Sequence, residues 1–233
     1  MKRIVIVGSA GTGKSTLARR LGTLLGAPVI HLDELNWEPG WKALPVEVFR
    51  SRLREAVSGE KWITDGNYAI HSFDLRMPRA DLVIWVERPV WHCLWRVLRR
   101  AIGSHFRVDE DLAKGCKERL DGRFLDRLRY IANFSRVNRP RIEAQRLAHG
   151  PNVPVMVLRG DSEISAFLDG CDRTRRLKGE SDLLEAMSEE QKPKDTQPDK
   201  NEAANERPVP SQAEGDLETI EEDLKQKESK NKS

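Results

Sequence analysis

Short apolar runs alternate along the chain with longer segments in which apolar residues recur every three or four positions. The runs are rich in Val, Ile and Leu, and we expect them to form five strands, at 2–7, 28–32, 61–64, 81–86 and 153–158. The intervening segments have the spacing of helices with one buried face, at 15–25, 45–57, 89–102, 124–137 and 162–168. A further helical stretch follows the fourth of these and reaches 148. This alternation predicts an α/β fold with a five-stranded parallel sheet covered on both faces.

The composition divides the chain into regions. Residues 1–170 contain every expected strand and form the predicted folded domain. Within it, 103–128 is polar and charged with weak helical periodicity, which predicts a helical lid insertion. Residues 171–190 are expected to be a linker. Residues 191–233 contain no aromatic residue and are rich in charged and polar residues, so we expect a disordered tail.

One glycine-rich stretch between the first strand and the first helix fits the pattern G-x-x-x-x-G-K-[ST]. The nine residues of this expected P-loop are Gly8, Ser9, Ala10, Gly11, Thr12, Gly13, Lys14, Ser15 and Thr16. A loop between strand and helix is the context in which this pattern binds phosphates. It predicts a P-loop NTPase fold, a three-layer α/β/α sandwich.

The residue types of the loop suit the chemistry of a nucleoside triphosphate. Glycines tolerate positive φ, so the backbone N–H groups turn inward, and the helix N-terminus adds its dipole beneath the anion. Lys14 is expected to reach the β- and γ-phosphates, and the Ser15 hydroxyl to ligate Mg²⁺.

Two carboxylates follow expected strands at the edge of the sheet where ligands bind in α/β folds. Asp65 precedes Gly66 and is a candidate to hold a magnesium-bound water or to orient an acceptor hydroxyl, although an Asp-Gly turn is the structural alternative. Asp33 is a candidate for contacting the acceptor, with a cap for the next turn as the alternative.

Arginines are the candidates for holding phosphate oxygens during transfer. Arg96, Arg99 and Arg100 lie on one expected helix, and Arg96 and Arg100, four residues apart, share a face. Arg139 and Arg141 flank a proline after the expected lid and are candidates for the closing half of a clamp. The alternative for each of them is a solvated basic surface. The weaker candidates for holding an acceptor phosphate are Arg76 and Arg79.

The tryptophans divide between core and site. Trp62 and Trp85 lie in expected strands and are assigned to the core, and Trp91 and Trp95 are expected to pack as well. The loop around 37–41, which holds two more tryptophans, is a candidate wall of an acceptor pocket.

Charge is unevenly distributed along the chain. Residues 1–171 hold 28 Lys and Arg against 20 Asp and Glu, whereas 172–233 hold 12 against 17. The basic N-terminal region suits the binding of phosphorylated ligands. It would also suit nucleic acid, whose phosphates attract the same positive charge. The three cysteines form no CxxC pair, and no signal peptide or membrane-spanning run is evident, so we expect a cytoplasmic protein.

The combined motifs resemble those of the bacterial DNA topology modulation proteins, P-loop proteins related to adenylate kinase. The segments that carry the resemblance are 7–16, 30–33, 37–41, 62–68 and 111–120. It implies a nucleoside-monophosphate-kinase-like fold over about 1–168. Adenylate kinase has Asp-Gly-Phe-Pro-Arg-Thr after its third strand, so a metal-water role carries over to Asp65. Its acceptor-binding arginine has no counterpart at Ala69 or Ile70.

Two hypotheses follow for function. The first is a P-loop kinase that transfers the γ-phosphoryl group of ATP, with Mg²⁺, to a small acceptor, a nucleotide being one candidate. Ser15 and Asp65 would hold the metal, and Asp33 the acceptor. The second is a nucleotide-dependent regulatory ATPase that acts on DNA or a protein partner, although the sequence holds no helix-turn-helix or zinc module.

Overall fold

A computed structural model describes residues 1–103 and 122–190 of the chain. Its centre is a five-stranded parallel sheet with the order β2-β5-β1-β6-β7. The strands are β1 (Arg3–Gly8), β2 (Val29–His31), β5 (Trp62–Asp65), β6 (Leu82–Glu87) and β7 (Val155–Arg159). All five predicted strands are therefore present, and the predicted parallel arrangement is confirmed.

Burial explains why the first apolar run is continuous. Ile4, Val5, Ile6 and Val7 of the central strand β1 are completely buried, because helices cover both faces of the sheet. The edge strand β7 differs, since Val155 and Met156 remain 40% and 37% exposed.

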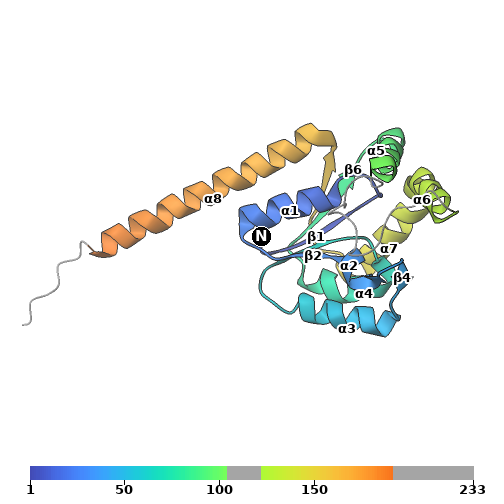
Figure 1. Cartoon of the computed structure of the whole chain (residues 1–233). Helices are drawn as coiled ribbons and strands as arrows, with labels where there is room; N and C mark the ends of the chain where they lie inside the picture. Colours follow the sequence, from blue (N-terminus) through green and yellow to red (C-terminus); the bar gives the residue numbers. More distant parts are fainter. Residues whose placement is uncertain (104–121, 191–233) are drawn as a thin grey trace, which may run out of the picture. The chain divides into compact units, whose positions relative to one another are not determined.

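Two helical layers cover the sheet (Figure 1). On one face, α1 (Lys14–Leu25) and α8 (Gly160–Glu190) pack on side chains such as Ile6 and Ile84. On the other face lie α3 (Val46–Ala56), α4 (Ala69–Arg76) and α7 (Arg139–His149), which pack on Val5 and Trp85. The chain is thus the three-layer α/β/α sandwich that the sequence predicts.

A helical arm leaves the sheet after β6. It consists of α5 (Val90–Gly103) and α6 (Gly122–Asn133), and one turn of π-helix, η2 (Phe134–Asn138), joins α6 to α7. Cys93 and Val97 of α5 pack against Phe124 and Ile131 of α6. The predicted lid at 103–128 thus includes the start of α6, but 104–121 lie outside the described residues.

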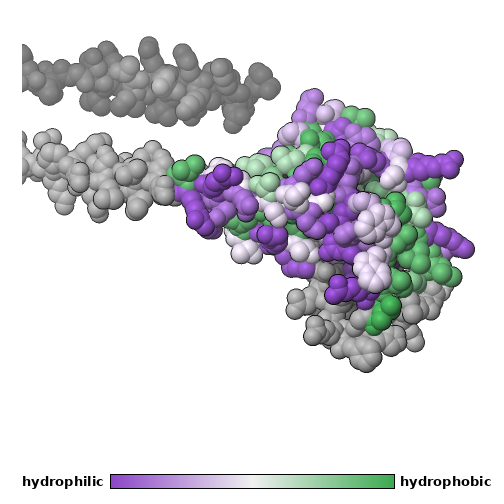
Figure 2. All heavy atoms as spheres, turned by 90° about the horizontal axis from the view of Figure 1, so that it is seen from above, coloured by the Kyte–Doolittle hydropathy of each residue, from purple (hydrophilic) through white to green (hydrophobic). Residues whose placement is uncertain are grey.

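The outer face of α5 contradicts one prediction about packing. Trp91 and Trp95 were expected to pack, but they are 69% and 59% exposed. Leu98 is also exposed, and the buried positions are Cys93, Val97 and Ala101. Trp62 and Trp85, assigned to the core, are indeed buried. In the view of Figure 2 the surface is largely hydrophilic, with hydrophobic residues gathered toward one side.

Several short elements were not predicted. The loop around 37–41 contains a hairpin of β3 (Trp37–Glu38) and β4 (Lys42–Ala43), with Trp41 at φ 62° between them. The helices α2 (Leu32–Asn36) and α4 and the 3₁₀ turn η1 (Met77–Arg79) were also missed. The helix α4 begins at Ala69, and the preceding residue, Tyr68, has a φ of 36°, which is unusual for a residue other than glycine, so no ordinary cap marked its start.

The C-terminal part of the described chain is one helix. The range 171–190, predicted as a linker, lies within α8, which is much longer than the predicted 162–168. Contacts divide the chain into Met1–Glu190 and Gln191–Ser233, and the predicted tail at 191–233 lies outside the described residues. No helix in the described ranges combines the length and apolarity needed to cross a bilayer.

Candidate functional site

The P-loop connects β1 to α1 at the carboxyl edge of the sheet. Gly8, Gly11 and Gly13 have φ values of 149°, 79° and 95°. A Cβ atom at Gly8 would lie 2.4 Å from the Val86 carbonyl oxygen, and one at Gly11 would lie 2.7 Å from the Cys93 carbonyl oxygen. Close approach of β6 and α5 therefore demands glycine at both positions.

Contacts within the P-loop close it on itself. The Thr12 hydroxyl donates a hydrogen bond to the Ser9 carbonyl oxygen at 2.9 Å, and the Lys14 ammonium donates to the same oxygen at 2.8 Å. Thr12 and Ser9 are both buried, whereas Lys14 is partly exposed. The lysine thus lies along the loop with its charge near the carbonyl groups.

Arg88 holds the outer side of the P-loop, a role that the sequence did not indicate. Its Nε donates to the Thr12 carbonyl oxygen at 2.8 Å, and its guanidinium forms a two-point ion pair with Asp161 at the start of α8. The side chain of Arg88 is 4% exposed. It therefore ties the loop to the C-terminal helix.

A small hollow of about 120 Å³ lies between the P-loop and α5. It is bordered by Gly11, Gly13, Lys14, Ser15, Thr16, Arg96, Val97 and Arg100. All of these residues except Val97 were predicted for the site, so the structure brings the P-loop together with Arg96 and Arg100. The first turn of α1 contains no acidic residue and no side chain caps Gly13, so the hollow is electropositive and suited to an anion.

Asp65 is the last residue of β5. It lies beside Ile6 of β1, and Ile6 precedes the first P-loop residue by two positions. It is 6% exposed, and its Oδ2 lies 3.0 Å from His31 Nδ1. Its Oδ1 is buried and has no hydrogen-bond partner among the described residues. A buried carboxylate oxygen without a partner is costly, and it points to a group that is absent from the structure.

The ionisation of Asp65 depends on its neighbours. Burial raises the pKa of this carboxyl, but the His31 hydrogen bond, the Lys14 charge and the Ser15 hydroxyl together outweigh burial and lower it. The hydrogen bond to Asp65 correspondingly raises the pKa of His31. The pair therefore favours a carboxylate beside the P-loop.

Asn67 forms a link that the sequence pattern did not indicate. Its side chain Oδ1 accepts from the Gly8 N–H at 3.1 Å, and its Nδ2 donates to the Gly8 carbonyl oxygen at 2.9 Å. Nδ2 also donates to the Tyr130 hydroxyl oxygen at 3.0 Å. One amide thus connects the first residue of the P-loop to α6 of the helical arm.

Asp33 lies further from the P-loop hollow, on the exposed surface of α2. The Tyr68 hydroxyl donates to Asp33 Oδ1 at 2.6 Å, and burial together with the Asp33 charge raises the pKa of Tyr68. The Asp33 charge also raises the pKa of Tyr130, after the larger effect of burial. Asp33 therefore holds one tyrosine by a hydrogen bond and acts on the other, the partner of Asn67, through its charge.

Neither arginine of the predicted post-lid clamp borders the hollow that contains Lys14. Arg139 begins α7, where its Nη1 lies 2.5 Å from Glu87 Oε1 and its guanidinium lies 5.2 Å from the centre of the Trp85 ring. Arg141 is exposed on α7. The predicted post-lid clamp is therefore not part of this hollow, and Arg139 instead borders a second cavity together with Ser9 and Thr12 of the P-loop.

The weaker candidates are structural. Arg76 is completely buried and donates to Thr64 Oγ1, the Gly66 and Asn67 carbonyl oxygens and Ser72 Oγ. Arg79 donates to the carbonyl oxygens that follow α3. Both arginines satisfy backbone groups, and neither is available to hold a phosphate.

Trp37 and Trp41 lie near Asp33 in the sequence and contact each other edge to face at 5.6 Å. The Arg127 guanidinium of α6 lies 5.0 Å from the centre of the Trp41 ring. The hairpin and the helical arm therefore meet over this side of the sheet, where the acceptor wall was predicted.

Comparisons with known proteins give no family by sequence. No protein-family model and no curated protein matches the chain. Solved structures similar to the chain include a shikimate kinase from Acinetobacter baumannii in complex with shikimate, with 18% identity over 78% of this chain and 96% of that one. A second is shikimate kinase from Bacteroides thetaiotaomicron, with 17% identity over 75% and 98%. The TM-score is 0.45 for each.

Proposed function

We propose that the protein is an ATP-dependent phosphotransferase that passes the γ-phosphoryl group to a small acceptor. The observation that carries the proposal is the electropositive hollow in which the P-loop faces Arg96 and Arg100 of α5, with a buried carboxylate beside it. Phosphoryl transfer needs charge stabilisation and positioning more than covalent chemistry, and these groups supply both.

The roles follow from the geometry of the hollow. Backbone N–H groups of residues 11–16 would hold the β-phosphate, and Lys14 would leave the Ser9 carbonyl to contact the phosphate oxygens. Arg96 and Arg100 would stabilise the negative charge on the transferring group. Together they would also exclude water, which favours transfer over hydrolysis.

The residues present fit a magnesium ion. Mg²⁺ prefers oxygen ligands and keeps several waters, which matches the hydroxyl of Ser15 and the unpartnered Oδ1 of Asp65. Ser15 would bind the ion directly and Asp65 through water. The ion would supply charge neutralisation on the phosphate oxygens.

The acceptor is proposed to bind over β2 and β5, next to Asp33 and the hairpin of Trp37 and Trp41. A small metabolite with a hydroxyl or phosphate group suits this polar and aromatic surface. A nucleoside monophosphate is the less favoured acceptor, because the acceptor-binding arginine of adenylate kinase has no counterpart at Ala69 or Ile70. Membership of the DNA topology modulation proteins remains a prediction from the motifs.

The test is ADP release from Mg-ATP with and without a panel of nucleosides, nucleoside monophosphates and small hydroxylated metabolites. We expect one class of compound to raise the rate by at least about tenfold. Lys14→Ala should lose this activity by about a hundredfold or more, whereas Lys61→Ala, on the exposed surface before β5, should keep it. A slow rate that no compound stimulates would overturn the kinase proposal in favour of a regulatory ATPase.

A further inference from the structure

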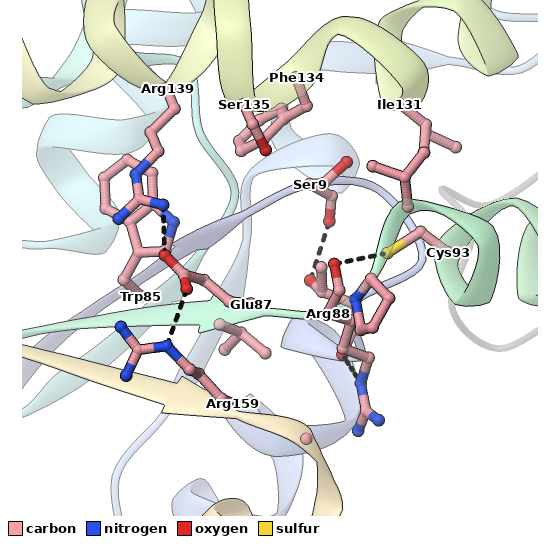
Figure 3. Close-up of a pocket in the computed structure, with 15 residues that line it drawn as sticks. Ser9, Trp85, Glu87, Arg88, Cys93, Ile131, Phe134, Ser135, Arg139 and Arg159 are labelled. Atoms are coloured by element: carbon pink, nitrogen blue, oxygen red, sulfur yellow. Dashed lines mark hydrogen bonds and ion pairs between the residues drawn. The ribbon is translucent and has the colours of Figure 1, made fainter.

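A second cavity, called the rear cavity below, borders the P-loop at Ser9 and Thr12 and is separate from the phosphate hollow. Its volume is about 500 Å³, within the usual range for small-molecule sites. It opens at the carboxyl ends of β6 and β7, between the sheet and the joint of α6 with η2 (Figure 3). It shares no bordering residue with the hollow that contains Lys14.

The inner wall of this rear cavity is mainly apolar. Trp85, Val86 and Pro89 border it from the β6 side, and Ile131 and Phe134 from the helical arm. Ser9 lies between these two walls in Figure 3, and its buried hydroxyl oxygen lacks a hydrogen-bond partner among the described residues. An apolar cavity with one unsatisfied hydroxyl is typical of a site that binds a mainly apolar molecule with a fixed orientation.

The other end of the rear cavity carries a surplus positive charge. Arg139 and Arg159 lie on opposite sides of Glu87 (Figure 3), with Arg159 Nε 3.2 Å from Glu87 Oε2. Two guanidinium groups thus share one carboxylate, which leaves a net charge of one unit. Arg159 borders the cavity and its side chain is 64% exposed, so its guanidinium is accessible to a ligand.

We propose that the rear cavity binds an aromatic or branched apolar molecule that carries a single anionic group. The apolar body would lie between Phe134 and Trp85, and the anion would contact Arg159 at the opening. This chemistry differs from that of the phosphate hollow, so the bound molecule would not compete with ATP. The proposed site is bordered by Ser9, Thr12 and Arg139, which were predicted for the nucleotide site, but by none of the residues that border the phosphate hollow.

The first test uses anilinonaphthalene sulfonate, an aromatic monoanion whose fluorescence rises in apolar sites. We expect saturable binding of one probe per chain of the full-length protein, with an affinity that saturating Mg-ATP changes by less than about threefold. Displacement of the probe by Mg-ATP would overturn the proposal, because the cavity would then belong to the nucleotide site.

The second test fills the cavity. Ser135→Phe places an aromatic ring at its border, and we expect at least about tenfold weaker probe binding. Ser51→Phe, the same change at an exposed position of α3, should leave binding unchanged. If Ser135→Phe does not fold by circular dichroism, Val90→Trp at the first residue of α5 serves the same purpose. Unchanged binding in a folded variant would overturn the proposal.

The third test isolates the charge. Naphthalene carboxylate should displace the probe at least about tenfold better than naphthalene methanol, its neutral counterpart. Arg159→Gln should remove most of this preference. Equal displacement by the two competitors would show that the cavity selects apolar bulk alone, which contradicts the proposed anion.

Discussion

Asn67 offers the sharpest test of how the P-loop is held in place. Asn67→Asp keeps the size of the side chain but removes its N–H donors. A carboxylate oxygen would then face the Gly8 carbonyl oxygen, which now accepts from Nδ2 at 2.9 Å. The Gly8 N–H would keep its acceptor, and the Tyr130 hydroxyl would be able to turn and donate. The substitution therefore mainly removes the hydrogen bond to the Gly8 carbonyl oxygen.

The expected cost combines two contributions. A lost hydrogen bond is worth about 1 kcal/mol, and a buried carbonyl left without a donor costs a further 1–3 kcal/mol, roughly. We therefore expect the free energy of unfolding to fall by about 3 kcal/mol at neutral pH. Since domains are stable by about 5–15 kcal/mol, the variant should remain folded.

The destabilisation caused by Asn67→Asp should depend on pH, and the direction of this dependence follows from the pKa of the new aspartate. The facing carbonyl disfavours the charged form of the new aspartate, so its pKa in the folded state should lie above the unfolded value. A protonated carboxyl can donate to the Gly8 carbonyl oxygen. The stability that the protonated aspartate contributes is thus present at low pH and is lost as the pH rises through the raised pKa. The difference in the free energy of unfolding between the variant and the native protein should therefore be smaller at pH 5 than at pH 8.

The assay is urea unfolding followed by tryptophan fluorescence, since Trp62 and Trp85 are buried. Asn133→Asp is the matched control, because Asn133 lies exposed on α6 and donates one hydrogen bond to the Arg129 carbonyl oxygen. We expect it to cost less than about 1 kcal/mol. An Asn67→Asp variant as stable as this control, or destabilised equally at pH 5 and pH 8, would refute the proposed anchoring.

Two further predictions concern charge at the hollow. Arg96→Ala should lower kcat for phosphoryl transfer by about a hundredfold, because its guanidinium borders the hollow, whereas Arg99→Ala on the exposed face of the same helix should change kcat by less than about twofold. A similar loss in both variants would contradict the assignment. The hydrogen bond to Asp65 raises the pKa of His31. The stability that this hydrogen bond adds is therefore present at low pH and is lost as the pH rises through the raised pKa of His31. His31→Gln should remove this pH dependence of urea unfolding above pH 6, and a dependence that persists would assign it to another group.

The sheet and the P-loop were predictable from sequence because each depends on local pattern. The β-branched run of β1 is buried on both faces, and the glycine spacing of the loop reflects close backbone approach at Gly8 and Gly11. The pairing of Arg96 with Arg100 followed from helical spacing. These features involve residues within one or two turns of each other, where periodicity determines position.

The contacts that hold the site together were not predictable, since they join distant segments. Asn67 and Gly8 are 59 residues apart, and Arg88 and Asp161 are 73 apart. Arg139 likewise pairs with Glu87 of β6, a contact that its position in the sequence did not indicate. Trp91 and Trp95 were misassigned because apolar residues on a helix indicate a face but not whether a neighbour covers it.

The P-loop is held from both sides, and this bears on how it would act. Asn67 fixes the backbone of its first residue, and Arg88 fixes the Thr12 carbonyl. Within this rigid frame, Lys14 holds the Ser9 carbonyl with a contact that a phosphate would replace. The loop would therefore need little ordering when a nucleotide binds, and the main change within it would be the movement of Lys14. Because Asn67 also contacts Tyr130 of the helical arm, a movement of α6 would be transmitted to the loop through a single side-chain amide.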